Sequence, residues 1–171
     1  MAENFLQLNQ DKTEVLVIGP QAQREKPLPK LQSLSFNPSS QVKNLGVIFD
    51  SELTLIPHIK NITKIGFYHL KNIARVRPIL SRANTETLMH AFITSRIDYC
   101  NALLSGLPKK RISGLQLLPN SAARVLTKTR RRDHITPVLE SLHWLPVCFR
   151  IDFKVLLMIF KCLNGLGPSY L

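Results

Sequence analysis

The sequence has no apolar run long enough to cross a membrane. Its longest run, Val155 to Phe160, is far shorter than the ~18 residues that a spanning helix needs. The first residues, MAENFLQLNQDKTE, also lack the basic segment followed by an apolar segment that is typical of a secretory signal. We therefore expect no membrane partner for this chain.

Cysteine is scarce, with three residues in a chain of 171. Cys100, Cys148 and Cys162 are widely spaced, so they form neither a C-x-x-C metal pair nor a disulfide framework. Their simplest interpretation is buried or idle thiols in a reducing compartment. We expect the chain to reside in the nucleus or the cytoplasm.

Recognisable catalytic sets are also absent. The sequence has no glycine-rich phosphate loop, no G-x-S-x-G elbow and no His/Cys cluster at zinc spacing. A phosphoryl-transfer polymerase needs carboxylates that hold two metal ions, and the neighbouring Asp50 and Glu52 do not make a convincing pair. We expect no catalytic residue, no metal site and no cofactor in this chain.

The charge is abundant and segregated. The net charge is +12, and residues 61–132 hold the whole excess, with fourteen basic and two acidic side chains. Residues 1–60 and 133–171 are each neutral overall. A segregated positive excess predicts a polyanionic partner.

The N-terminal third predicts short strands and turns. Residues 3–9 are typical of the end of a helix, and Val15 to Ile18 is a β-branched run closed by Gly19-Pro20. Further strands are predicted at Leu31 to Phe36 and at Asn44 to Asp50. These pieces indicate a small sheet or hairpin.

From about Ser51 the pattern becomes helical. The first helix has apolar residues at helical spacing, namely Ile59, Ile62, Gly66, Leu70 and Ile73. Four cations, Lys60, Lys64, Lys71 and Arg75, fall within roughly 60° of each other on another side. Such a stripe is either a solvated face or a surface that contacts phosphates, and the sequence favours neither.

Two further long helices are predicted. Residues 84–105 form one, capped by Asn84 or Ser81, with its buried face made by Phe92, Ile93, Ile97, Cys100 and Leu104. Residues 109–129 form the other, with Ile112, Leu115, Leu118, Ala122 and Val125 on one side and Arg124 and Lys128 opposite. Pro119 lies within this helix and should kink or split it.

Two basic clusters border the third helix. One is Lys109, Lys110 and Arg111, and the sharper one is KTRRR, with Lys128, Arg130, Arg131 and Arg132. Such runs are typical of phosphate contacts or of a nuclear import signal. A solvated helix end, where cations suit the helix dipole, is an equally good interpretation.

The last part predicts a short helix at 135–143 and a final helix at 149–164 that is apolar on nearly every side. The expected fold class is therefore α+β, mostly α. A small antiparallel β hairpin or sheet at the N-terminus precedes a bundle of about five helices.

Taken in order, several segments together resemble a known family. They are LQLNQDKTEVLVIG, NLGVIFD, HIKNITK, FITSRIDYCNALLSGLP, SAARVLTKTRRRDHITPVLESLHWLPV and FRIDFKVLLMIFKCLNGLGPSYL. They resemble the reverse transcriptases of non-LTR retrotransposons, the long interspersed, jockey-like elements of animal genomes. The resemblance covers nearly the whole chain.

The resemblance implies roles for individual residues. NQDKTE resembles polymerase motif D, which implies that Lys12 lies near the phosphates of the incoming nucleotide. NLGVIFD resembles motif E, the primer grip, which implies that Leu45, Gly46 and Val47 lie against the primer end. Residues 1–53 would be the end of the palm, and residues 54–171 a helical thumb-like region and the segment beyond it.

The family's metal-binding aspartates belong to motifs upstream of Met1, so the Mg²⁺ of the parent polymerase has no ligands here. We expect a non-catalytic fragment of an RNA-directed DNA polymerase that binds RNA, DNA or an RNA–DNA hybrid through phosphates. The missing palm and fingers are a further candidate partner. The alternative is a basic helical protein with a host interaction role, or a relic of a decayed element without function.

Overall fold

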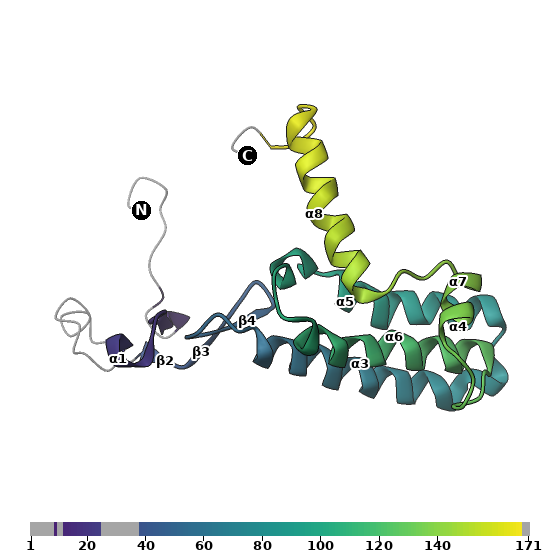
Figure 1. Cartoon of the computed structure of the whole chain (residues 1–171). Coiled ribbons are helices and arrows are strands. Elements are labelled where there is room, and N and C mark those ends of the chain that lie inside the picture. Colours follow the sequence, from purple (N-terminus) through teal and green to yellow (C-terminus); the bar gives the residue numbers. More distant parts are fainter. Residues whose placement is uncertain (1–8, 10–11, 25–37, 169–171) are drawn as a thin grey trace. The chain divides into compact units, whose positions relative to one another are not determined.

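The computed structural model describes residues 9, 12–24 and 38–168. Contacts divide the chain into two compact units, Met1–His58 and Ile59–Leu171, and each is described by itself. The N-terminal unit holds a small antiparallel sheet and the second unit is helical (Figure 1). The predicted α+β, mostly α fold class is confirmed.

The N-terminal unit consists of short elements. They are β1 (Val15–Leu16), α1 (Gln21–Arg24), β2 (Pro38–Ser39), β3 (Gln41–Asn44) and β4 (Val47–Asp50). β1 pairs with β2 in parallel, and β3 pairs with β4 in antiparallel register, with Gln41 opposite Asp50. The helix end predicted at residues 3–9, apart from residue 9, and the strand predicted at 31–36 lie outside the described residues.

The segment from Asn44 to Asp50 is not the single strand that the sequence predicted. Leu45 and Gly46 have φ angles of 45° and 84°, so the chain reverses between Asn44 and Val47. Positive φ at both central residues is the conformation of a two-residue type I′ hairpin turn, whose twist matches that of paired strands. A glycine adopts it without strain, and this turn divides the segment into the end of β3 and all of β4.

The second unit is built on α3 (Ile56–Val76) and α6 (Lys109–Thr127). The predicted apolar face of α3 is confirmed, since Ile59, Ile62, Gly66, Leu70 and Ile73 are all buried. Gly66 faces Leu118 of α6 so closely that a Cβ atom on the glycine would overlap the leucine side chain. The two helices can therefore approach each other only because residue 66 has no side chain.

The helix predicted at 84–105 is shorter and irregular. It consists of α4 (Arg82–Met89), a π-helical turn η4 (His90–Thr94) and α5 (Ser95–Asp98), and is followed by a 3₁₀ turn η5 (Asn101–Leu104). Ser81 is the cap, because its Oγ accepts a hydrogen bond from the Asn84 N–H at 3.1 Å. Another 3₁₀ turn, η3 (Arg77–Ile79), links α3 to this segment.

The irregular course of this helix explains why two residues that were predicted to be buried are exposed. Met89, Ile93 and Ile97 are buried at a spacing of four residues, which fits the wider turn of a π-bulge. Phe92 is instead 41% exposed. Cys100 is exposed because the chain has already left the helix, with Cys100 in a left-handed conformation (φ 52°).

Pro119 does not split α6, contrary to one form of the prediction. The helix continues from Lys109 to Thr127, and Pro119 itself is buried. A proline inside a helix costs about 3 kcal/mol. The completely buried side chains on the same helix offset this cost; they are Leu115, Leu118, Ala122, Ala123 and Leu126.

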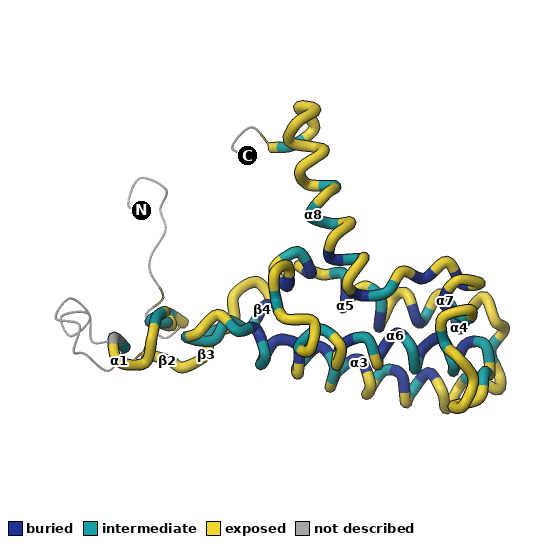
Figure 2. Tube along the Cα trace, viewed as in Figure 1, coloured by how far each residue is buried: buried dark blue, intermediate teal, exposed yellow. Residues whose placement is uncertain are grey.

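Two helices complete the unit, α7 (Thr136–Ser141) and α8 (Val147–Leu163). The start of α8 is fixed by two polar contacts. The Val147 N–H donates to Gln116 Oε1 at 2.7 Å, and Arg150 forms an ion pair with Asp98 at 2.9 Å. Beyond these contacts α8 is largely exposed (Figure 2).

We predict that Gly66→Ala lowers the free energy of unfolding by about 1–3 kcal/mol, because the added methyl group must displace the fully buried Leu118. Gly114→Ala is the matched control within α6, since nothing lies within 4 Å of its added Cβ. That variant should gain roughly 0.5–1 kcal/mol from helix propensity. Urea denaturation measures both, and equal effects of the two variants would contradict the close α3–α6 contact.

Candidate nucleic-acid interface

The predicted basic stripe on α3 exists as one surface. Lys60, Lys64, Lys71 and Arg75 are all exposed, and they lie on the side of α3 away from its buried face. No acidic residue occurs anywhere in α3. The four positive charges are therefore not neutralised by carboxylates of their own helix.

Two aromatic side chains lie within this stripe and were missed by the sequence prediction. Tyr68 is four residues after Lys64 and three before Lys71, so it shares their face and is 64% exposed. Phe67 is part-exposed beside it, at 37%. The helical spacing of these aromatics relative to the lysines was the available signal. Bases can stack on exposed aromatic rings set between cations.

α3 and α6 run in the same direction. Gly66 faces Leu118 near the middle of both helices, and Arg77, just after α3, donates through Nη2 to the Leu126 carbonyl oxygen at 3.2 Å. Arg77 thus satisfies a carbonyl group in the last turn of α6. The Arg75 end of the basic stripe consequently lies beside the C-terminal end of α6.

The KTRRR cluster forms a compact turn at that end of α6. Lys128 has a left-handed conformation (φ 58°) that terminates the helix, and Arg130, Arg131 and Arg132 are exposed. The Asp133 carboxylate accepts the Arg130 N–H at 3.1 Å. The turn therefore directs several arginines outward from a fixed backbone.

Arg124, a predicted phosphate contact, holds this turn in place. Its Nη1 donates to the Arg130 carbonyl oxygen, and its Nη2 donates to the Asp133 carbonyl oxygen at 2.7 Å. The guanidinium thus bridges α6 and the turn that follows it. Arg124 is better described as a residue that positions Arg130 to Arg132 than as an open contact site.

The other basic cluster is remote from this end. Lys109, Lys110 and Arg111 form the first turn of α6, and about 17 residues separate them from Lys128. At ~1.5 Å per residue the two clusters are roughly 25 Å apart along the helix. The structure therefore places the KTRRR turn at the Arg75 end of the α3 stripe, and Lys109, Lys110 and Arg111 at the level of its Lys60 end.

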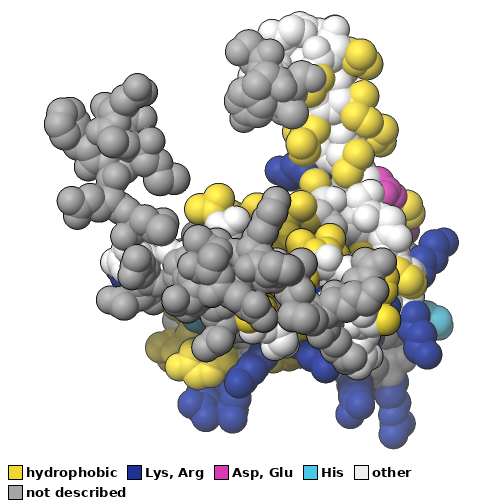
Figure 3. Space-filling model, turned by 90° about the vertical axis from the view of Figure 1, so that its left-hand side faces the viewer, with side chains coloured by type: hydrophobic (Ala, Val, Ile, Leu, Met, Phe, Trp, Pro, Cys, Tyr) yellow, Lys and Arg dark blue, Asp and Glu magenta, His cyan; other side chains and the backbone are white. Residues whose placement is uncertain are grey.

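The basic residues are prominent in the space-filling view. Figure 3 shows Lys and Arg side chains gathered along the lower side of this face, and among the described side chains visible there no acidic one lies between them. We call the combination of Lys60, Lys64, Lys71, Arg75, Tyr68 and the KTRRR turn the basic face.

Of the residues predicted by resemblance in the N-terminal unit, Lys12, Leu45 and Gly46 are exposed, whereas Val47 is buried and cannot contact a primer directly. Leu45 is 82% exposed at the tip of the β3–β4 hairpin, beside Gly46. Lys12 lies before β1, where its backbone N–H donates to Asn9 Oδ1 at 3.3 Å. The Lys12 side chain and the turn at Leu45 and Gly46 are therefore accessible to a ligand.

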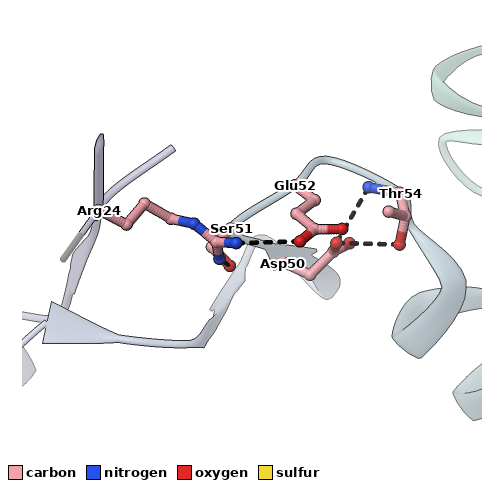
Figure 4. A network of polar contacts seen from close by, with 5 residues as sticks. All are labelled: Arg24, Asp50, Ser51, Glu52 and Thr54. Carbon is pink, nitrogen blue, oxygen red and sulfur yellow. Dashed lines mark hydrogen bonds and ion pairs between the residues drawn. The ribbon is translucent and has the colours of Figure 1, made fainter. Parts of the chain in front are cut away.

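Asp50 and Glu52 have structural partners (Figure 4). Asp50 Oδ2 accepts the Thr54 N–H at 3.0 Å and its hydroxyl at 2.9 Å, while Oδ1 accepts the Leu55 N–H at 2.8 Å. Burial acts to raise the pKa of Asp50, but these hydrogen bonds outweigh it and hold the pKa below 3.8. Glu52 pairs with Arg24 at 2.9 Å. The two carboxylates thus order the segment between β4 and α3.

His58 joins this segment to the hairpin. The side chain is buried, and its Nδ1 accepts the Ile48 N–H at 3.4 Å. Burial lowers the pKa of His58 from 6.5, since a charged imidazole would lose its hydration. A protonated Nδ1 could not accept this hydrogen bond, so both effects favour the neutral ring.

The described residues provide no candidate metal site. In that part of the chain no group of three or more His, Cys, Asp or Glu side chains could hold a metal ion. Nor do the described helices include one that is long and apolar enough to cross a membrane. Cys100, Cys148 and Cys162 are free and exposed, so of the two interpretations, buried or idle thiols, burial is wrong.

Comparison with known proteins adds no relative. No family model matches the chain, and neither a curated protein nor a solved structure matches it.

The lowered pKa of His58 predicts a specific pH dependence. Folding favours the neutral ring, so this stabilisation is complete above pH 6.5 and is lost as the pH falls through the lower folded-state pKa. NMR titration of His58 and hydrogen exchange at the Ile48 amide should show the two changes together. His58→Asn is the control, because its amide oxygen can accept the same bond without titrating. A His58 pKa at or above 6.5 would contradict the prediction.

Proposed function

We propose that this chain is a non-catalytic fragment of a non-LTR retrotransposon reverse transcriptase, and that its basic face holds a nucleic-acid duplex by the phosphate backbone. The observation that carries the proposal is the basic face itself. An acid-free stripe runs along α3, and Arg77 holds its Arg75 end at the same end of the helical unit as the KTRRR turn. Positive charge without nearby carboxylates suits phosphate better than any neutral ligand.

The dimensions of the stripe suit a duplex. Lys60 and Arg75 are fifteen residues apart, which is roughly 22 Å along a helix. Nucleotides of one strand follow each other at about 3.4 Å along the duplex axis, so the stripe faces about six of them. Lysines and arginines on such a surface position a duplex and carry little sequence information. This is the behaviour that a polymerase thumb requires.

The N-terminal unit would supply the remaining part of the function. Under the proposal, the Leu45-Gly46 turn is the primer grip, with Val47 behind it, and Lys12 approaches the phosphates of the incoming nucleotide. Catalysis would need the palm and fingers of the parent polymerase, together with its Mg²⁺ ligands. The partners proposed for this chain are therefore RNA, DNA or their hybrid, and the missing palm and fingers.

Salt-dependent binding tests the basic face. The wild-type chain should bind an RNA–DNA duplex with an affinity that falls steeply with salt. Changing Arg130, Arg131 and Arg132 to Ala should reduce the slope of log K against log salt by roughly 0.9 for each phosphate group that the variant no longer neutralises. Fluorescence anisotropy over a salt series measures this slope.

The matched control removes the same charge from the opposite end of α6, by changing Lys109, Lys110 and Arg111 to Ala. That variant should keep the contribution of the KTRRR turn to the slope, because these residues lie beside the Lys60 end of α3, roughly 25 Å from the turn. Equal reductions of the slope in both variants would mean that phosphate contact is not concentrated at the KTRRR turn. Absence of binding at low salt would leave the alternative of a relic or a host interaction protein.

Tyr68 should contribute by stacking. We predict that Tyr68→Ala weakens binding to a single-stranded overhang by roughly tenfold, the loss of affinity expected for one stacked base, with an unchanged salt slope. Tyr68→Phe keeps the ring and should bind like the wild type. Anisotropy with overhang and blunt duplexes measures both, and a slope change in Tyr68→Ala would argue against stacking.

A further inference from the structure

The last helix presents an apolar surface that nothing in the described chain covers. Only Val147 and Ile151 of α8 are buried. Other large apolar side chains of α8 are exposed by half or more; they include Phe149 (57%), Phe153 (57%), Leu156 (64%), Phe160 (57%) and Leu163 (81%). Contiguous apolar surface of this kind marks an interaction site.

These five residues follow each other at intervals of four, three, four and three. That alternation is the a/d spacing of a heptad repeat, in which apolar residues recur every 3.5 residues on average and pack against a second helix. We call Phe149, Phe153, Leu156, Phe160 and Leu163 the α8 seam. At 3.6 residues per turn they lie within roughly 80° of each other.

Most of the α8 seam lies on the side of the helix away from its own unit, while Phe153 also lines a hollow with Asp98 and Asn101. Val147 and Ile151 pack inward, and the seam is centred roughly 170° around the helix from them. Two contacts hold the helix in this orientation. They are the ion pair between Arg150 and Asp98 and the hydrogen bond from the Val147 N–H to Gln116. The seam is therefore presented outward by a fixed helix base.

We propose that the α8 seam pairs with the α8 seam of a second copy of this chain. At about 200 Å² for a fully exposed large apolar side chain, the seam offers roughly 600 Å² per copy. The flanking Leu157 and Ile159 extend this towards the about 800 Å² per partner of a stable interface. A heptad stripe is self-complementary, so two identical helices satisfy each other's apolar residues.

The charges of α8 do not oppose this pairing. Lys154 and Lys161 occupy the heptad position that follows Phe153 and Phe160, which points away from the helix partner. Asp152 and Arg150 carry opposite charges beside the seam. The net charge of +12 is concentrated in residues 61–132 and not in α8. The positive charges by which two copies repel each other thus lie outside the proposed contact.

The test is the mass of the full chain in solution by sedimentation equilibrium. Nuclease treatment and about 0.5 M NaCl remove nucleic acid that could bridge two basic faces. We expect a dimer at about 100 μM protein. Phe153→Glu with Phe160→Glu should raise the dissociation constant at least about 100-fold, because both charges would be buried in the seam.

The matched control adds the same two charges to the other side of α8, by Met158→Glu with Cys162→Glu. Both residues are exposed, and this variant should remain dimeric. Circular dichroism checks that each variant keeps its helix, and Leu156→Glu is a single-site substitute if the double seam variant aggregates. A monomeric wild type at about 100 μM, or a seam variant that still dimerises, would overturn the proposal.

Discussion

The helical unit depends on the close approach of α3 to α6. The two helices meet where Gly66 faces Leu118, and no larger residue fits at position 66 without displacing a fully buried side chain. Arg77 fixes the far end of the same pair by donating to the Leu126 carbonyl oxygen. The contact therefore sets both the distance and the relative direction of two helices that carry basic residues and no acidic ones.

That arrangement explains how like charges are kept together. Cations spaced along one face repel each other, and α3 and α6 contain no carboxylate to relieve this. The surrounding structure instead orients them: burial of one side of α3 turns the lysines outward, and Arg124 restrains the turn that carries Arg130 to Arg132. A surface built in this way gains from binding a polyanion, because the partner removes the repulsion that the fold leaves in place.

The tertiary structure uses its few acidic residues to order the backbone. Asp50 arranges the chain that enters α3, Asp98 fixes the base of α8, and Asp133 closes the KTRRR turn. Each of these carboxylates is therefore occupied by a local partner rather than by a lysine of α3. These three carboxylates therefore do not neutralise the charge on α3.

The sequence by itself determined the helical class, the buried face of α3 and the exposed stripe opposite, because helical periodicity places residues on faces without reference to any neighbour. It also gave Ser81 as one of two candidate caps, which the structure decides, and it showed the segregated charge. Only the tertiary structure decided the rest. Packing of α6 kept the helix continuous through Pro119. A π-helical turn left Phe92 exposed, where the sequence predicted a buried residue.

Positive φ at Leu45 and Gly46 turned a predicted strand into a hairpin. Only the parallel direction of α3 and α6 shows which end of the stripe each basic cluster is near. The KTRRR turn lies at the Arg75 end, and Lys109 to Arg111 lie at the level of the Lys60 end. Local sequence cannot give that direction, because it is fixed by contacts between residues some fifty positions apart, such as Gly66 with Leu118 and Arg77 with Leu126.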